Sequence, residues 1–444
     1  MRRIEINPVS RIEGHARVTI FADERDRVER VFFQTTELRG YEKLVLGLPA
    51  EEVPRVVSTI CGICRAVHFT AALKALDSVF GVTPPEDAEK IRRLVLYANV
   101  IEDHAASLLI LALPDLVGER DVFSSFNRIG VDVAKNLLKK RSYAVKTIEM
   151  LAGRFLHPVS AVPGGWSKRP ERKEVELIRK YSKELVQLGM ELFDLVHSLI
   201  GEVQEFDVKS LHYLATSGKG AEFYDGVQKV MNGDGEEVLS FSERDYDAFV
   251  RERVEEHSYA KNAVVNAGGQ DFEVITGVAA RFHAGFERYD LSSELYRGLS
   301  EIIKPQVISP VRNYLLRALE VVYCAEAMVD IAENTDFTGP LVNKDYRITR
   351  EGIGIVEAPR GTLIHHYRTD GSGNVVKARI ITPTQFNIPA MNALLNEGLK
   401  GRGANAEAMS YAENLIRTFD PCMACSTHSL DGKTMVEFEI VRKR

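Results

Sequence analysis

The sequence predicts a mainly helical α+β fold, with a central bundle of long helices, small N-terminal and C-terminal β elements and a peripheral mixed lobe. From about residue 49 to residue 200, apolar residues recur at steps of three or four, the period of a helix with one buried face. Residues 14–34 and 352–383 alternate as short strands do. Between about 208 and 275, Gly and Asp clusters interrupt the pattern, which indicates a lobe rich in turns.

The first elements are two short strands, on either side of the polar turn at residues 23–27. Long helices follow, because their apolar positions share one face. Two prolines, Pro305 and Pro310, should break the last of these helices. Four long helices of this kind can form a central bundle. The predicted helices cover about residues 91–108, 131–153, 175–199 and 292–334.

Towards the C-terminus, residues 353–356 and 375–381 have strand character, and the turn at 370–374 predicts a hairpin. Helices at about 389–397 and 405–418 lead into the final segment. The sequence shows no repeat and no long linker, so we expect one body with lobes. The expected segments are an N-terminal β segment (1–48), two parts of the helical core (49–205 and 291–345), a peripheral mixed lobe (206–290), a β-hairpin and C-terminal active-site segment (346–428) and a tail (429–444).

Composition indicates a globular, cytoplasmic type of protein. The chain has 444 residues, of which 45% are hydrophobic and 27% charged, enough for a large core. A net charge of -6 without a basic stripe argues against a nucleic-acid partner. The sequence contains no run of about 18 uninterrupted apolar residues, so no membrane span is predicted. Residues 1–5 lack the apolar core of a signal peptide.

Four of the five cysteines form two Cys-x-x-Cys pairs at opposite ends of the chain, Cys61 with Cys64 and Cys422 with Cys425. A two-residue gap lets both sulfurs face one soft metal ion. Structural zinc, a redox disulfide pair and a catalytic metal all fit this spacing. A large domain with its own core does not need a zinc staple. The fifth cysteine, Cys324, lies in an apolar helical run and is interpreted as a core residue.

The neighbours of the cysteines favour one of these alternatives. The run from Asp420 to His428 closely resembles the C-terminal Asp-Pro-Cys-x-x-Cys-x-x-His signature of nickel-iron hydrogenase large subunits, and Cys61 to His68 resembles their N-terminal signature. The length and the Pro-Thr-Gln-x-Asn block are most similar to the cytoplasmic, cofactor-coupled branch (group 3). Four further blocks match in order: Arg11–His15, Arg39–Glu42, His157–Pro158 with Pro163–Gly165, and Ala358–Gly361 followed by Pro383–Asn387.

The resemblance implies an enzyme that cleaves dihydrogen reversibly and heterolytically into protons and electrons. Nickel would be held by Cys61, Cys64, Cys422 and Cys425. The second cysteine of each pair would also bridge to an iron that carries carbon monoxide and cyanide ligands. Soft sulfur donors suit nickel.

Further roles are implied for polar residues of the matching blocks. Cys422 would accept the proton and Glu13 would pass it outward. Taken alone, Glu13 would be interpreted as a strand carboxylate paired with Arg11 or Arg17, but the complete block favours proton transfer. Arg360, held by Asp420, would lie over the metals as a hydrogen-bond donor.

Other residues would support the same centre. Pro383 and Thr384 would lie beside a cyanide, with Thr384 as the donor. For His68 and His104 two interpretations stay open: each either supports the metal centre or is a core histidine whose hydrogen bonds are satisfied.

A second metal ion, magnesium or iron, is also implied near the C-terminus. Its ligands would be Glu42, the backbone carbonyl of Ile388 and His428, a mixture that leaves the ion's identity open. Glu37 is the less favoured alternative to Glu42. The chain departs from the family at Thr59, where arginine is usual, so a contact to a neighbouring helix or to the electron-transfer partner is expected to differ.

The electrons need iron-sulfur clusters, each with several thiolates, and Cys324 alone cannot supply them. We therefore expect an iron-sulfur small subunit, docked near the cysteine pairs, and further flavin or iron-sulfur subunits. Residues 429–444 resemble a tail that a maturation protease removes. The acceptor stays open between NAD(P), a deazaflavin coenzyme, ferredoxin and a disulfide. The rival classes are a subunit like the quinone-site subunit of respiratory complex I, which lacks the nickel cysteines, and a zinc scaffold.

Overall fold

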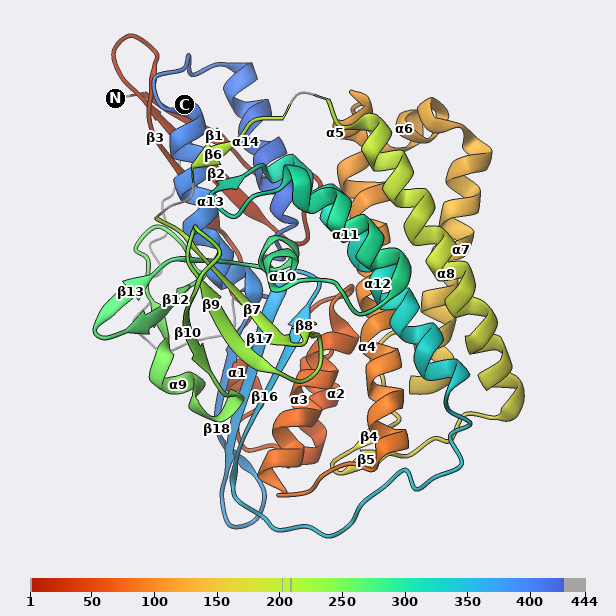
Figure 1. The fold of residues 1–444 in the computed structure, drawn as a ribbon. Helices are drawn as coiled ribbons and strands as arrows, with labels where there is room; N and C mark the ends of the chain where they lie inside the picture. Colours follow the sequence, from red (N-terminus) through yellow and green to blue (C-terminus); the bar gives the residue numbers. More distant parts are fainter. Residues whose placement is uncertain (1, 202, 208–209, 427–444) are drawn as a thin grey trace, which may run out of the picture.

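Four long helices form the right-hand side of the computed structural model in Figure 1, and the structure describes all residues except 1, 202, 208–209 and 427–444. They pack side by side as a bundle (Figure 1), which confirms the predicted helical core. Helix α8 buries one continuous apolar face, as its period of three and four residues predicts. The four helices are α4 (Glu86–Ala106), α7 (Val131–Ala152), α8 (Arg172–Leu199) and α12 (Asn313–Glu333).

The N-terminal β segment is an antiparallel sheet of three strands, β1 (Arg2–Ile6), β2 (Ala16–Ala22) and β3 (Val28–Thr35), in that order. The second and third strands are the two that the sequence predicts. Strand β3 packs against helix α13 (Pro383–Leu399). That helix begins at Pro383 rather than at Pro389 as predicted, because proline is well placed in a first helical turn and Thr382 and Gln385 form a capping box.

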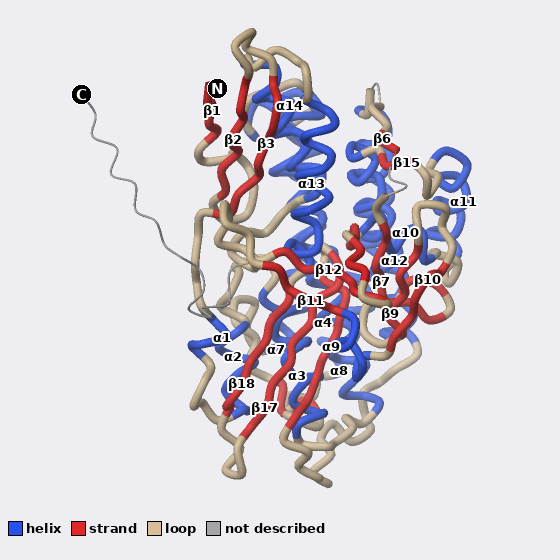
Figure 2. The backbone as a smooth tube through the Cα atoms, turned by 90° about the vertical axis from the view of Figure 1, so that its left-hand side faces the viewer, coloured by secondary structure: helices blue, strands red, loops and turns tan. Residues whose placement is uncertain are grey.

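The C-terminal sheet contains three strands, although the sequence predicted a hairpin. They are β16 (Glu351–Ala358), β17 (Gly361–Thr369) and β18 (Val375–Ile381), paired antiparallel. Figure 2 shows β17 and β18 side by side. The sequence missed β17 because nearly all its side chains are buried, so it lacks alternation. Helix α3 (Arg65–Val79) packs across β16.

The peripheral lobe is more regular than predicted. One sheet has the order β10-β9-β7-β14, with β8 paired to β7, and a second has the order β11-β12-β13. The lobe returns to the bundle through α10 (Val278–Ala284) and α11 (Asp290–Ile302). The break after α11 contains both predicted prolines. The strands are β7 (His212–Gly218), β8 (Gly220–Ala221), β9 (Val227–Met231), β10 (Glu237–Phe241), β11 (Val250–Arg253), β12 (Asn262–Ala267), β13 (Gln270–Phe272) and β14 (Val274–Thr276).

The boundaries of the six expected segments stay a prediction.

The remaining helices and the two-residue strands connect the parts described above. Further helices are α1 (Tyr41–Leu44), α2 (Val53–Val57), α5 (Leu113–Val117), α6 (Val122–Ile129), α9 (Tyr246–Phe249) and α14 (Ala406–Phe419), and the two-residue strands pair as β4 (Ala161–Val162) with β5 (Gly165–Trp166) and β6 (Phe206–Asp207) with β15 (Val307–Ile308).

One helical run, Glu86–Val117, is long and apolar enough to cross a membrane by length and composition alone. In the fold, 89% of its most apolar window is buried inside the protein. Helix α4, which starts this run, packs against α7 and α12. Its apolar character is therefore used in the core of the bundle. Cys324, on α12, is also fully buried there, as predicted.

The close approach of α8 to α12 depends on Gly189. A Cβ atom at this position would lie 2.7 Å from Val322 Cγ2 and 2.8 Å from the Val322 amide nitrogen. We expect Gly189→Ala to lower the free energy of unfolding by about 1–3 kcal/mol through overpacking, measured by urea unfolding. Gly298→Ala on α11 is the control, because its Cβ would meet nothing within 4 Å. An equal loss in both variants would contradict the packing explanation.

Candidate metal centre

The two cysteine pairs, far apart in the sequence, meet in the interior. The Sγ atoms of Cys61, Cys64, Cys422 and Cys425 all lie within 4.8 Å of one another, and all four residues are buried. Cys422 Sγ is 2.8 Å from Cys425 Sγ and 3.5 Å from Cys61 Sγ. Among the described residues, no other group of Cys, His, Asp and Glu side chains has this arrangement.

The first pair is placed by the start of helix α3. Cys64 is the residue before its first turn, and Cys61 Sγ accepts from the amides of Ile63 and Cys64, both at 3.4 Å. Amides at a helix N-terminus stabilise negative charge, so they favour a thiolate here. Asn99 on α4 holds this loop, since its Nδ2 donates to the Ile63 carbonyl at 2.9 Å.

The second pair follows the end of helix α14. Asp420 ends this helix in a left-handed conformation. The Cys422 amide then donates to Thr384 Oγ1 at 3.1 Å, and the Met423 amide donates to the Glu13 carbonyl at 2.8 Å. Gly14 has φ +79°, and a Cβ there would be 2.9 Å from the Ala424 amide nitrogen. The glycine of the Arg-Ile-Glu-Gly-His block therefore lets the N-terminal segment lie against the second cysteine pair.

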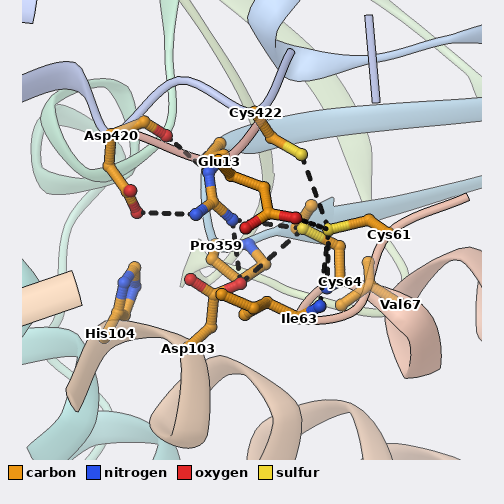
Figure 3. Close-up of polar contacts among 12 residues, drawn as sticks. Glu13, Cys61, Ile63, Cys64, Val67, Asp103, His104, Pro359, Asp420 and Cys422 are labelled. Carbon is orange, nitrogen blue, oxygen red and sulfur yellow. Dashed lines mark hydrogen bonds and ion pairs between the residues drawn. The ribbon is translucent and has the colours of Figure 1, made fainter. Parts of the chain in front are cut away.

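Arg360 lies beside the Cys64 thiol and between two buried aspartates, Asp103 and Asp420, both of which Figure 3 labels. Its Nη1 donates to Asp103 Oδ2 at 2.8 Å and to Cys64 Sγ at 3.1 Å, and its Nη2 is 3.0 Å from Asp420 Oδ2. Its Nε also donates to the Asp420 carbonyl. The structure thus joins Arg360 and Asp420, as the sequence predicts.

Asp103 is a residue of the site that the sequence did not predict. It lies in the last turn of α4, a helix whose apolar period predicts only a core helix. The sequence does contain one sign of its role: a carboxylate on the buried face of a helix almost always has a partner of opposite charge or a hydrogen-bond donor. Burial raises its pKa to about 6, although Arg360 opposes this shift.

The thiols influence one another's ionisation strongly. Hydrogen bonds from Cys422, Cys425 and Cys64 hold the pKa of the Cys61 thiol well below its usual value, while the bond with Cys422 raises the pKa of Cys64. Burial raises the pKa of Cys422 to about 11. Four thiolates this close repel one another. A bound cation would allow all four to ionise together, so the donor set fits a soft metal ion.

Glu13 also reaches this cluster. Its Oε1 is 3.6 Å from Cys61 Sγ, and burial, followed by the charge of Cys61, raises its pKa to about 7. Cys61 is thus a thiol in direct contact with Glu13, and the acceptance of the proton by Cys422 stays a prediction. The alternative, in which Glu13 pairs with Arg11 or Arg17, is not observed. Arg11 donates to Asp115, and Arg17 donates to Gln34. The side chain is half-buried, so it lies between the centre and the surface.

Two histidines occupy different surroundings. His68 Nε2 lies 3.4 Å from Cys425 Sγ and its Nδ1 lies 3.0 Å from His365 Nε2. Burial lowers the pKa of His68 to about 4, so the ring is neutral near pH 7. His104 Nε2 instead lies 2.8 Å from Glu320 Oε2. His68 therefore contacts a predicted metal ligand, and His104 belongs to a buried polar cluster beside it.

The second predicted metal site is described only in part. Glu42 Oε1 accepts from the Ile380 amide at 2.7 Å, Ile388 is buried within α13, and His428 lies outside the described residues. Glu37 pairs with Arg39 at 3.1 Å. Thr59, the departure from the family pattern, accepts from the Tyr41 hydroxyl through its carbonyl at 2.9 Å.

The fold and the site together define a protein with a buried four-thiol site that could hold a metal ion, built from two segments far apart in the chain. Comparison with known proteins assigns its family. A model described as nickel-dependent hydrogenase matches residues 39–128 and 273–428, and a model described as HoxL-like matches residues 3–38.

Similar proteins cover almost the whole chain. An F420-non-reducing hydrogenase iron-sulfur subunit of Archaeoglobus profundus is 38% identical over 98% of this chain and 96% of its own length. The NAD-reducing hydrogenase HoxS subunit beta of Cupriavidus necator is 30% identical with the same coverage. A crystal structure of an NAD+-reducing [NiFe]-hydrogenase in the H2-reduced state aligns with TM-score 0.91 and 29% identity, over 96% of this chain and 100% of that chain.

This chain belongs to the nickel-dependent hydrogenase family and is the large, catalytic subunit of a nickel-iron hydrogenase. It is therefore an oxidoreductase that acts on hydrogen. The zinc-scaffold and quinone-site alternatives do not agree with this membership and with all four cysteines in place.

Proposed function

We propose that Cys61, Cys64, Cys422 and Cys425 hold a nickel-iron centre, with Cys64 and Cys425 as the bridging thiolates. The observation that carries this proposal is the cluster of four buried thiols within 4.8 Å. When bound, the centre would supply the heterolytic cleavage of dihydrogen, with carbon monoxide and cyanide as further ligands of the iron. The protein supplies the soft donors, the burial and the charges around them.

Arg360 is the cationic donor of this site. Its guanidinium contacts a thiol and two carboxylates at once, and the charges of Asp103 and Asp420 raise its pKa although burial opposes them. A fixed, always charged donor in a dry site can stabilise negative charge on the substrate or on a cyanide ligand. Pro383 starts helix α13, and Thr384 supports the Cys422 amide and is proposed as a second donor to a cyanide.

Glu13 is the proposed exit for the proton. The Sγ atoms of Cys422 and Cys61 are 3.5 Å apart, and Glu13 Oε1 lies 3.6 Å from Cys61 Sγ. A proton received by a thiolate of this pair can therefore reach a half-buried carboxylate. The raised pKa of Glu13, about 7, suits a group that both accepts and releases a proton near neutral pH.

The electrons pass, in this proposal, to an iron-sulfur small subunit that docks near the first cysteine pair. Arg65 follows Cys64 and donates to the Phe155 carbonyl at 2.7 Å, which places the loop after α7 beside the centre. In that loop, Leu156 and Val159 are 52% and 46% exposed. Exposed apolar side chains of this kind fit a protein interface.

Several finer points complete the proposal. Two similar proteins are named F420-non-reducing and NAD-reducing, so we assign the choice of acceptor to further flavin or iron-sulfur subunits. A cytoplasmic location agrees with five unpaired thiols. Glu42, Ile388 and His428 would hold magnesium or iron. A maturation protease would remove residues 429–444, and the intact mass of native protein tests this.

Metal analysis combined with infrared spectroscopy of the purified complex tests the centre. We expect about one nickel per large subunit, with iron in excess because the other subunits carry iron-sulfur clusters, together with bands from carbon monoxide and cyanide. Zinc in place of nickel, or the absence of these bands, would overturn the proposed centre. The same preparation treated to remove its metal is the control, and it should lose the bands and all turnover of dihydrogen.

A further inference from the structure

A second buried arginine, Arg281 on α10, lies directly behind the residues that carry Arg360. It is 0% exposed, and both of its neighbouring carboxylates are fully buried as well. Its Nε and Nη2 donate to the two oxygens of Glu320, both at 2.7 Å. Its Nη1 donates to Glu357 Oε2 at 2.7 Å. One rigid guanidinium is therefore held by two carboxylates from different elements, α12 and β16.

The same guanidinium also binds the turn between β16 and β17. Nη1 donates to the Ala358 carbonyl and Nη2 to the Pro359 carbonyl, each at 3.0 Å. Strand β16 ends at Ala358 and β17 begins at Gly361. Arg281 thus fixes the two residues that immediately precede Arg360.

The other side of this turn is closely packed. A Cβ atom at Gly277 would lie 2.7 Å from the Arg360 carbonyl oxygen. Thr276 Oγ1 accepts from the Thr362 amide at 2.9 Å, and Asn387 Nδ2 donates to the Arg360 carbonyl at 3.3 Å. The backbone of Arg360 is therefore held between these contacts and Arg281, so it has little room to shift while both remain.

Glu320 connects this clamp to the partner of Arg360. Its Oε2 accepts from Arg281 and lies 2.8 Å from His104 Nε2. His104 is the neighbour of Asp103, whose Oδ2 accepts from Arg360 Nη1. The Glu320 side chain therefore contacts both Arg281, which binds the turn before Arg360, and His104 on α4, the helix that carries Asp103.

Stability is a weak explanation for such a cluster. Removing an arginine and two carboxylates from water is costly, and apolar replacements of buried ion pairs are often neutral or stabilising. Geometry is the better explanation, because the planar guanidinium has donors in fixed directions. Here those donors meet two carboxylates and two backbone carbonyls.

We propose that Arg281 is a positioning residue, which sets the Ala358–Pro359 turn and thereby the place of the Arg360 guanidinium beside the thiolates. This inference rests on the proposed function for Arg360. It assigns no contact with substrate to Arg281. The effect is transmitted through the backbone of the turn.

The test compares Arg281→Lys with Arg92→Lys in the assembled hydrogenase. Arg92 is a matched control, because it is also 0% exposed, pairs with Asp77 and donates to the carbonyls of Val162 and Gly165, both at 3.1 Å. It holds a different loop. Lysine keeps the positive charge in both variants but cannot make the same set of directed bonds.

Two readouts are needed, hydrogen exchange and steady-state kinetics. In Arg281→Lys, amide exchange in residues 357–362 should rise about 2- to 10-fold, the effect of losing one hydrogen bond, and kcat should fall about 10- to 100-fold at unchanged nickel content. In Arg92→Lys, neither should change, whatever the loss of thermal stability. Unchanged exchange in this turn, or an equal fall of kcat in both variants, would overturn the proposal.

If Arg281→Lys does not fold, the double variant Arg281→Gln with Glu320→Gln takes its place. It removes one positive and one negative charge, so the net charge of the buried cluster is preserved. It should show the same local exchange and the same loss of kcat. The variant Arg360→Lys distinguishes the proposed role of Arg360 from that of Arg281. Full turnover in this variant would overturn the role of Arg360, whereas the exchange result concerns Arg281 alone.

Discussion

Cys422→Ser is expected to abolish nickel retention and dihydrogen turnover, with a loss of activity greater than the about 10- to 100-fold typical of residues that only support a metal ligand. Cys422 Sγ belongs to the four-thiol cluster and lies 2.8 Å from Cys425 Sγ and 3.5 Å from Cys61 Sγ. A serine hydroxyl is a harder donor and stays protonated near neutral pH, so it binds nickel poorly. Nickel per chain, measured by elemental analysis, and hydrogen-dependent dye reduction check this result.

The matched control is Cys324→Ala. Cys324 is equally buried, but it lies in α12 outside the four-thiol cluster. This variant should keep its nickel and most of its activity, with a modest loss of stability from the smaller side chain. Normal nickel content in Cys422→Ser would remove Cys422 from the metal site.

Glu13→Gln is expected to keep the metal and to lower turnover about 100-fold or more, the contribution of a positioned acid-base group. Glutamine has nearly the same shape and can still contact Cys61, but it cannot carry a proton to solvent. Nickel content should therefore stay at the level of the unmodified protein while hydrogen oxidation and proton reduction both fall. Activity assays in both directions, normalised to nickel, measure the effect.

Glu5→Gln serves as the control for this change. Glu5 is a strand carboxylate of the same N-terminal segment that pairs with Arg17 at 3.6 Å, which is the role that Glu13 would have as a simple surface residue. It should have no effect on turnover. Full activity of Glu13→Gln would exclude Glu13 as the proton exit.

Local sequence patterns predicted much of the fold. The buried face of α8 and the break between α11 and α12 followed from helical period and from proline chemistry. Strand β17 did not, because a strand buried on both faces has no alternation to detect. The start of α13 was misplaced because two prolines competed for it, and the capping box at Thr382 decided in favour of the first.

The site divides in a similar way. Cysteine spacing and the neighbouring blocks predicted a shared metal centre and the Arg360–Asp420 pair. Asp103 and Arg281 were missed, because Asp103 lies in a predicted core helix and Arg281 lies in the short helix α10, within the segment expected to be the peripheral lobe. Their roles come from partners on other elements, at sequence separations that no local pattern records.

By itself, the sequence determined that the chain has two chelating cysteine pairs, that the segments around them resemble the signatures of nickel-iron hydrogenases, and that the chain contains long helices. Only the tertiary structure decided that the Cys61 thiol contacts Glu13, that Asp103 pairs with Arg360, and that Arg281 binds the turn before Arg360. The physical reason is range. Ligand type and helical period are properties of short segments, whereas the directions of buried donors and acceptors are set when distant segments pack and every buried charge must find its partner.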